Sequence, residues 1–285
     1  LETIAKNNDN KDIYVEWSVN EKAALEVAAG AAYSGARVMV TMKQVGLNVA
    51  SDPLMCVNYI GVKGGMVIVV ADDPGPISSQ TEQDTRHFGE YGKFMVFDPS
   101  SAKEAYEMIG DAFEYSEKYG EPVIFRPTTR VCHSYQTIDI SEDRCEHIPE
   151  GFVKDAGRWV IFPRLSYSNH IKLEENMVKI SDEFSTYKYN TLTGSGKKGI
   201  ITGGVNYEYV MEVIGARTDI KVLKIATPNP FPEKLAVEFL EGVEEVLAIE
   251  ELDPYLEKQL TYVCGKYNKN VVVKGKLTYH IANAG

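Results

Sequence analysis

Short apolar runs alternate with helix-like segments along the first half of the chain. Continuous apolar strands separated by helices are typical of a parallel sheet that is covered on both faces. The expected strands are residues 13–17, 37–42, 66–71, 94–97 and 123–127. The expected helices are residues 20–34, 47–59, 83–91 and 102–119. The pattern therefore predicts an α/β domain with a mostly parallel sheet.

The alternation breaks between Cys132 and about Lys198, where glycines and prolines interrupt it and one helical piece, residues 168–187, stands alone. Beyond this stretch the expected strands are residues 199–202, 222–225, 246–250 and 271–274, and the expected helices are 207–216, 233–241 and 255–267. The sequence thus predicts two doubly wound α/β domains, residues 1–135 and 198–285, joined by a connecting arm at 136–197.

The composition is that of an ordinary soluble globular protein, with 44% hydrophobic and 25% charged residues in 285. The formal net charge is -11 and no run of basic residues occurs. Nucleic acid and anionic membrane surfaces are therefore not expected as partners. No signal peptide and no apolar stretch of membrane-spanning length is visible, so we expect a cytoplasmic protein.

The four cysteines predict neither disulfides nor a metal centre. Cys56, Cys132, Cys145 and Cys264 lie far apart and none forms a C-x-x-C pair. The two Cys/His groups, at 132–133 and 145–147, lack the paired short spacing that gathers four ligands around zinc. We expect no metal-ligating residues in this chain.

One carboxylate, Glu21, stands at the head of a helix made almost wholly of alanine and glycine. Ser18 and Glu21 have the spacing of a capping box, in which the glutamate returns a hydrogen bond to the start of the helix. That interpretation needs no catalysis. The alternative is that the small side chains let a ligand approach the helix closely and that Glu21 acts on it.

Two long stretches carry a family resemblance: VNEKAALEVAAGAAYSGARVMVTMKQVGLNVASDPL at 19–54 and ADDPGPISSQTEQDTRHFGEYGKFMVFDPS at 71–100. They resemble the pyrimidine-binding domain of the thiamine-diphosphate-dependent 2-oxoacid:ferredoxin oxidoreductases, most closely the branch that acts on indolepyruvate. The resemblance extends over nearly the whole chain, and the second domain is similar to the carboxy-terminal domain of transketolases. It implies oxidative decarboxylation of aryl 2-oxo acids to acyl-CoA, with electrons passing to ferredoxin.

The resemblance gives Glu21 a catalytic role, in which its carboxyl group shares a proton with N1′ of the aminopyrimidine ring in a dry site. Burial favours the protonated carboxyl, and the cofactor serves as the electron sink after CO₂ leaves. The turn after the strand at 37–42 is expected to contact the cofactor, because ligands bind beyond the carboxyl ends of parallel strands. The candidates there are Lys43, Gln44, Gly46 and Asn48. The alternative is an ordinary strand–helix turn with Asn48 exposed.

The polar loop after the strand at 66–71 is expected to contact substrate, with Gln80, Gln83 and Arg86 as candidates. Arg86 suits a two-pronged bond to a substrate carboxylate. Alternatively, Glu82, Asp84 and Arg86 form a solvated helix start. His87 is a weaker candidate for a proton shuttle, and Glu250–Glu251 reads as a surface pair.

Three parts of the family pattern are absent from this sequence: an opening strand with a Y-P-G-T-P turn, a diphosphate-binding domain with its magnesium motif, and the cysteine runs that hold 4Fe-4S clusters. We therefore expect the chain to be part of a longer alpha subunit, with half of a site for thiamine diphosphate and Mg²⁺. The resemblance implies a beta subunit, ferredoxin and CoA as partners and a dimer of heterodimers. The alternatives are a paralogue acting on pyruvate, 2-oxoglutarate or branched 2-oxo acids, and a non-catalytic assembly module.

Overall fold

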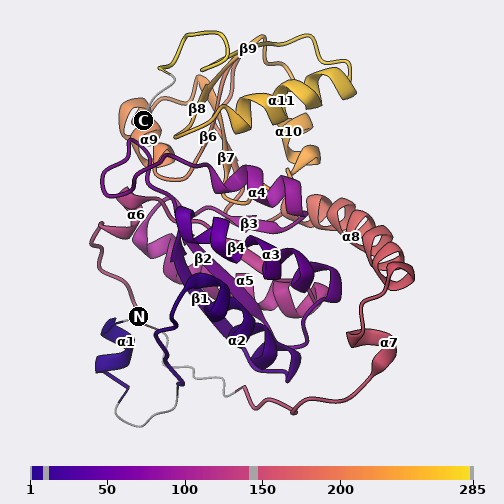
Figure 1. Ribbon diagram of the computed structural model, residues 1–285. Helices are drawn as coiled ribbons and strands as arrows, with labels where there is room; N and C mark the ends of the chain where they lie inside the picture. The colour runs from indigo at the N-terminus through magenta and orange to yellow at the C-terminus, as the bar shows by residue number, and fades with distance from the viewer. Residues whose placement is uncertain (1, 9–12, 141–146, 283–285) are drawn as a thin grey trace.

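The first half of the chain folds around a four-stranded parallel sheet in the order β1-β2-β4-β3. The computed structural model describes residues 2–8, 13–140 and 147–282 (Figure 1). The strands are β1 Val38–Lys43, β2 Met66–Ala71, β3 Met95–Phe97 and β4 Val123–Phe125. The helices between them are α2 Glu21–Tyr33, α3 Gln44–Ile60, α4 Thr85–Gly92 and α5 Ala102–Tyr119, and the short helices α1 Glu2–Lys6, α6 Thr129–Cys132 and α7 Ala156–Trp159 lie outside this alternation.

Successive strand residues point to opposite faces of this sheet, and each face has its own core. On one face Val40, Ile68 and Ile124 pack against α2 and α3. On the other face Val67 and Phe125 pack against α5 and the following helix α8, Pro163–Phe184. Every strand that is buried on both faces reads as a continuous apolar run, which is why the sequence predicted these strands.

The second half forms a five-stranded sheet in the order β5-β7-β6-β8-β9. Its strands are β5 Thr191–Thr193, β6 Lys198–Gly203, β7 Ile220–Ile225, β8 Glu245–Ile249 and β9 Val272–Lys274. Helices α10 Glu233–Phe239 and α11 Tyr255–Lys266 cover one face, and α9 Asn206–Ile214 covers the other. All pairings are parallel except that of β5 with β7.

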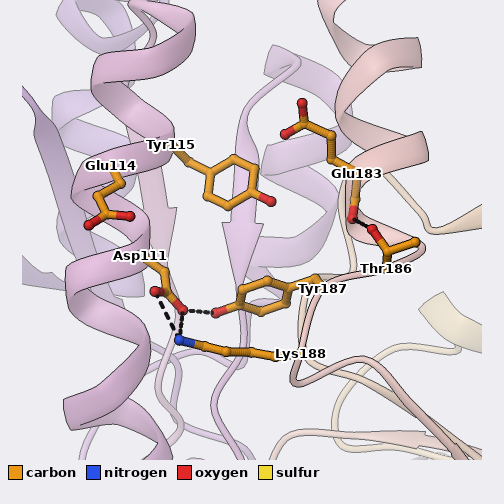
Figure 2. A pocket seen from close by; sticks show the side chains of 7 residues that line it. All are labelled: Asp111, Glu114, Tyr115, Glu183, Thr186, Tyr187 and Lys188. Atoms are coloured by element: carbon orange, nitrogen blue, oxygen red, sulfur yellow. Dashed lines mark hydrogen bonds and ion pairs between the residues drawn. The ribbon is translucent and has the colours of Figure 1, made fainter.

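Helix α8 runs along the side of the first sheet and leads into the second (Figure 1). It begins with a proline at its first turn and buries Leu173, Ile180 and Phe184. At its end, the Tyr187 hydroxyl donates to Asp111 of α5 at 2.7 Å, bordering an open acidic hollow of about 370 Å³ (Figure 2). Burial and the Asp111 carboxylate raise the pKa of Tyr187. The Asp111 carboxylate accepts from both Tyr187 and Lys188, so we assign these contacts to fastening the end of α8.

The predicted fold class, doubly wound and mostly parallel α/β, is confirmed. The strand predicted at residues 13–17 is wrong, because residues 14–18 have no regular structure and the side chains of Tyr14 and Trp17 are exposed. Its alternating pattern suits a strand, but no described strand pairs with it. Strand β5 was missed because its three residues, Thr-Leu-Thr, include only one apolar side chain. The domain boundaries at 135 and 197 stay predictions.

Candidate functional site

Glu21 is the first residue of α2, and it does not cap that helix. The cap is Asn20, whose side chain accepts a hydrogen bond from the Ala23 backbone N–H at 2.9 Å. The capping box expected between Ser18 and Glu21 is therefore wrong, since Asn20 already supplies what a helix start requires. The half-buried Glu21 side chain is left available for another role.

The Glu21 side chain lies against the first turn of α3, at Gly46. A Cβ atom added to Gly46 would come within 2.6 Å of Glu21 Cγ and 2.8 Å of Glu21 Oε1. Strand β1 passes into α3 without a loop, so Gly46 sits near the positively polarised start of that helix. The amino-terminal ends of α2 and α3 both favour a negative charge at this place. The absence of a side chain at Gly46 is what gives the carboxyl group its room.

The predicted cofactor turn and the predicted substrate loop lie together at the carboxyl ends of β1 and β2. In the structure this segment is the end of β1 and the start of α3, and three of its side chains bond the loop. These contacts are Lys43 Nζ to Ser78 Oγ at 2.8 Å, Gln44 Nε2 to the Thr81 carbonyl at 3.0 Å, and Asn48 Nδ2 to Gln83 Oε1 at 3.1 Å. Gln44 is 1% exposed, and its Oε1 has no hydrogen-bond partner. A buried amide oxygen without a donor is a place where a ligand N–H can bind.

The Asp73 side chain fixes the conformation of the substrate loop through hydrogen bonds. Its carboxylate accepts from the backbone N–H groups of Ser78 and Ser79 at 2.7 and 2.8 Å and from the Thr129 hydroxyl at 2.6 Å. Although burial opposes it, these hydrogen bonds hold the Asp73 pKa below its usual range. Gln80 is left exposed on this loop. Sequence reasoning missed the role of Asp73, although the run DDPGP following a buried strand was a signal.

The Arg86 side chain is buried among protein carboxylates. It is 2% exposed, and its guanidinium donates to Asp84, to Glu250 Oε2 at 2.8 Å and to the backbone carbonyls of Glu251 and Asp253. The predicted contact with a substrate carboxylate is not supported by this geometry, because each guanidinium nitrogen already has a partner. The alternative of a solvated helix start is wrong for the buried side chains of Asp84 and Arg86, although Asp84 does cap α4 and Glu82 is exposed.

Glu250 and Glu251 are buried, so their interpretation as a surface pair is wrong. Glu250 accepts from Arg86 and from the backbone N–H groups at the start of α11, and Glu251 accepts from Arg130 at 2.6 Å. Both acids follow β8, whereas both arginines belong to the first half of the chain. A buried ion pair, Arg86 with Glu250, and a partly exposed one, Arg130 with Glu251, therefore join the two sheets. We define Arg86, Asp84 and Glu250 as the inter-sheet ion cluster.

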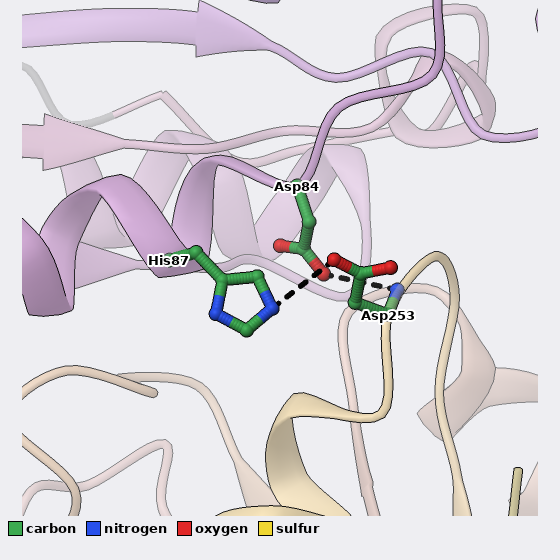
Figure 3. A group of neighbouring side chains, drawn as sticks. All are labelled: Asp84, His87 and Asp253. Carbon is green, nitrogen blue, oxygen red and sulfur yellow. Dashed lines mark hydrogen bonds and ion pairs between the residues drawn. The ribbon is translucent and has the colours of Figure 1, made fainter. Parts of the chain in front are cut away.

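His87 lies at this same junction. Its Nε2 is 3.1 Å from Asp253 Oδ2, and its ring packs edge-on against Tyr255. Asp84, His87 and Asp253 offer ligand atoms within 4.8 Å of one another (Figure 3). Both oxygens of Asp84 already accept bonds from Arg86, whose charge they balance. The geometry therefore explains these side chains as part of the junction and gives no further support to a proton shuttle at His87.

Asp98 gives the junction a pH dependence. Its Oδ2 is 3.0 Å from Arg126 Nη1, and its Oδ1 is buried without a partner. Burial raises its pKa to about 6 from 3.8, and Arg126 and Arg86 only partly oppose that rise. The folded state then holds the proton more tightly than the unfolded chain, so this stabilisation is full below about pH 4 and is lost as the pH rises through 6.

We expect the free energy of unfolding to fall by about 2 kcal/mol from this group between pH 4.5 and pH 7.5. The side chain of the variant Asp98→Asn cannot titrate, so this variant should lack that part of the fall in unfolding free energy with pH. Denaturant unfolding of both proteins at pH 4.5 and 7.5 measures the difference. Parallel pH profiles for the two proteins would contradict the assignment.

A model of the family described as pyruvate flavodoxin/ferredoxin oxidoreductase, thiamine diphosphate-binding, matches residues 1–167. The chain belongs to this family. Its match covers the first sheet, Glu21 and the loop that carries Asp73. Thiamine diphosphate is thus the cofactor that the family description names for this part of the chain.

Curated relatives of the chain agree with the family. It is 40% identical to indolepyruvate oxidoreductase subunit IorA of Pyrococcus horikoshii over 96% of this chain and 44% of that protein. It is 41% identical to the IorA subunit of Methanothermobacter marburgensis over 93% of this chain and 44% of that protein. The chain therefore spans about half the length of the curated relatives it matches.

Solved structures show the same fold. A 2-oxoglutarate:ferredoxin oxidoreductase from Magnetococcus marinus matches with a TM-score of 0.70 at 16% identity, over 96% of this chain and 56% of that chain. A split-gene transketolase matches with a TM-score of 0.60 at 17% identity, over 96% of this chain and 79% of that chain. Among the described residues, no helix is long and apolar enough to cross a membrane.

The residues around Glu21 fit one half of a thiamine site. A ring that carries both an N–H donor and a nitrogen acceptor can bond the unpartnered Gln44 Oε1 and share a proton with a carboxyl group. Because Gly46 has no side chain, none lies between its backbone and the Glu21 carboxyl group. This chemistry is that of an aminopyrimidine. The individual contacts of Glu21, Lys43, Gln44, Gly46 and Asn48 with the cofactor stay predictions.

Proposed function

We propose that the chain is part of the alpha subunit of an enzyme that oxidatively decarboxylates aryl 2-oxo acids, indolepyruvate among them, to acyl-CoA, with ferredoxin as the electron acceptor. The observation that carries this proposal is the identity of about 40% to IorA subunits over nearly the whole chain. A beta subunit and CoA are the further partners in this proposal, and the assembly is a dimer of heterodimers. The 4Fe-4S clusters belong to parts of the protein outside this sequence.

Within this function, Glu21 holds and returns a proton at the cofactor ring. Gln44 Oε1 accepts from the ring, and Gly46 keeps the space beside Glu21 open. Lys43 and Asn48 act through the loop that they bond, which presents Gln80 and Gln83 toward the substrate. Thiamine diphosphate, with Mg²⁺ on its diphosphate, supplies the electron sink that decarboxylation of a 2-oxo acid requires.

Replacing Gly46 with alanine is expected to lower decarboxylase activity of the full-length enzyme by about 10²-fold. The new methyl group would stand 2.6 Å from Glu21 Cγ, so the carboxyl group must shift by about 1 Å to reach normal contact. Steady-state turnover and thermal unfolding measure the two effects separately. Fold stability should change little, since alanine favours a helix.

The matched control is Gly30→Ala on α2. A Cβ atom at Gly30 would meet nothing within 4 Å. This variant should keep full activity and gain about 0.5–1 kcal/mol of stability. Equal activity of the two variants would show that Gly46 does not hold space for the Glu21 side chain.

A second candidate function is oxidation of branched 2-oxo acids. It is favoured by a weaker relative, ketoisovalerate oxidoreductase subunit VorB of Methanothermobacter marburgensis, 24% identical over 81% of this chain and 71% of that protein. Identity is lower than to the IorA subunits, so we rank this function second.

The experiment that tests the proposed function is a substrate panel. The full-length subunit, produced with its beta subunit under anaerobic conditions, is supplied with CoA, ferredoxin and one 2-oxo acid at a time. We expect kcat/KM to be highest for indolepyruvate and phenylpyruvate. A preference for 2-oxoisovalerate would select the second candidate, and lack of turnover with every 2-oxo acid would leave only the assembly-module alternative.

A further inference from the structure

A 2-oxo acid carries a carboxylate, and the candidate site already contains several negative charges. Glu21 lies beside Gly46, while Asp73 and Glu82 of the loop after β2 accept hydrogen bonds from the loop backbone. These carboxylates repel a substrate anion, and the whole chain has a net charge of -11. Binding of the substrate carboxylate at this edge of the sheet therefore requires a cationic side chain.

The arginines that follow β2 and β4 along the chain are not available for this purpose. Each of them already lies in ion-pair distance of a protein carboxylate. These pairs are Arg86–Asp84 at 2.5 Å, Arg126–Asp72 at 2.6 Å and Arg130–Glu251 at 2.6 Å. A substrate carboxylate that took one of these arginines would leave a protein acid without its counter-ion, which is costly for a buried group.

Lys43, the last residue of β1, is a cation whose partners are neutral. In the described part of the chain its Nζ bonds the Ser78 hydroxyl at 2.8 Å and the Ser78 carbonyl at 3.2 Å. An ammonium group has three N–H donors, and these bonds use two of them at most. The side chain is exposed, so the remaining donor is accessible. Lys43 thus offers a full charge and a donor that no described residue takes up.

The Lys43 ammonium group is also held in place. Strand β1 pairs with β2 along its whole length, and Lys43 stands opposite Ala71. Its partner Ser78 is fixed in turn, because the Ser78 backbone N–H donates to Asp73 at 2.7 Å. A cation that is positioned in advance loses less conformational freedom when it binds an anion. This anchoring distinguishes Lys43 from a lysine that moves freely on the surface.

Lys43 lies near Glu21 as well. It is the N-cap residue of α3 and precedes Gly46, which contacts the Glu21 side chain, by three residues. Three residues of a helix correspond to a rise of about 5 Å. The Lys43 side chain makes no capping bond, so the N–H groups of the first turn add positive potential at the same place. An anion bound to Lys43 would therefore lie within about one helical turn of Glu21.

We propose that Lys43 binds the carboxylate of the 2-oxo acid, donating its free N–H to a carboxylate oxygen while Ser78 keeps the ammonium group in place. This inference rests on the proposed function, which makes a 2-oxo acid the substrate. It applies to aryl and branched side chains alike, because the carboxylate is common to both. Substrate binding should therefore depend on the Lys43 charge, whereas binding of thiamine diphosphate should not.

The test replaces Lys43 with methionine in the full-length enzyme, assayed with its beta subunit, CoA and ferredoxin under anaerobic conditions. We expect KM for indolepyruvate to rise by about 10- to 100-fold, because a hydrogen bond from a charged donor is lost. We expect kcat to change by less than about threefold. Lys43→Arg keeps the cation and should stay within about fivefold of the wild-type KM. The control Lys179→Met removes an equal charge from an exposed position on α8 and should leave KM unchanged.

A second readout measures charge recognition without turnover. Isothermal titration calorimetry of the enzyme loaded with thiamine diphosphate compares indole-3-propionate with its primary amide, which has a similar shape and no charge. The wild-type enzyme should bind the carboxylate about tenfold more tightly than the amide, and Lys43→Met should lose this preference. A purely structural role of Lys43 would weaken both ligands equally. Lys43→Gln, which can still donate to the Ser78 carbonyl, is the second variant if Lys43→Met does not fold.

A raised KM together with loss of the preference for the carboxylate supports the assignment of Lys43. An unchanged KM or an unchanged preference in Lys43→Met would overturn it. Weaker binding of thiamine diphosphate at an unchanged KM would overturn it too, and would place Lys43 at the cofactor instead. Failure of the proposed function has a different signature, since the wild-type enzyme would then turn over no 2-oxo acid, a result that would overturn both.

Discussion

Replacing Glu21 with glutamine in the full-length enzyme is expected to lower kcat for 2-oxo acid decarboxylation by about 10²- to 10⁴-fold. Glutamine has nearly the same shape, but its amide cannot share a proton with a ring nitrogen. The start of α2 is unaffected, because Asn20 and not Glu21 caps it. Single-turnover measurement of CO₂ release, with thiamine diphosphate at saturation, reports the chemical step directly.

The matched control for Glu21→Gln is Glu26→Gln, which removes the same charge from an exposed position on the same helix. It should retain full activity. Unchanged Tm in both variants would show that any loss is chemical. If decarboxylation survives in Glu21→Gln at near the wild-type rate, the mechanism is wrong, and the non-catalytic assembly module becomes the better description.

The first sheet could be predicted from sequence because its strands are buried on both faces. Met66–Ala71 is a continuous apolar run and was predicted with correct bounds. The start of α3 could not be predicted, since Lys43 and Gln44 after an apolar strand resemble a loop. In the structure the chain passes from β1 into α3 with no loop, and this direct passage brings Gly46 to Glu21.

The junction between the sheets lay beyond sequence reasoning for a different reason. Charged residues are rarely buried, so Arg86 and Glu250 were expected at a substrate and at the surface. They are 164 residues apart, and the sequence around each residue does not indicate which residue it pairs with. Only the folded chain shows that each neutralises the other. The contacts of Lys43, Gln44 and Asn48 with the loop could not be predicted from sequence either. The placement of both segments at the carboxyl ends of strands could be predicted.

Replacing Arg86 with methionine is expected to lower the free energy of unfolding by about 3–5 kcal/mol. Methionine keeps much of the volume, but the carboxylates of Asp84 and Glu250, whose side chains are 1% and 2% exposed, would lose their shared counter-charge. The control is Arg217→Met, which breaks an exposed pair with Asp219 and should cost about 0–1 kcal/mol. Urea unfolding of both variants measures the difference.

The cause of the stability loss in Arg86→Met can be tested by also removing the charge of a carboxylate that is left without its counter-ion. In Arg86→Met/Glu250→Gln, one buried carboxylate becomes neutral while its shape and its bonds from the α11 backbone are largely kept. If the loss arises from uncompensated charge, the double variant should be more stable than Arg86→Met, and its advantage should shrink at low pH, where Glu250 takes up a proton. A double variant no more stable than Arg86→Met would instead assign the loss to packing around the missing guanidinium. Since the inter-sheet ion cluster is made only when the two sheets meet, recovery by charge removal would also show that Arg86 holds the two halves of the chain together by balancing charge.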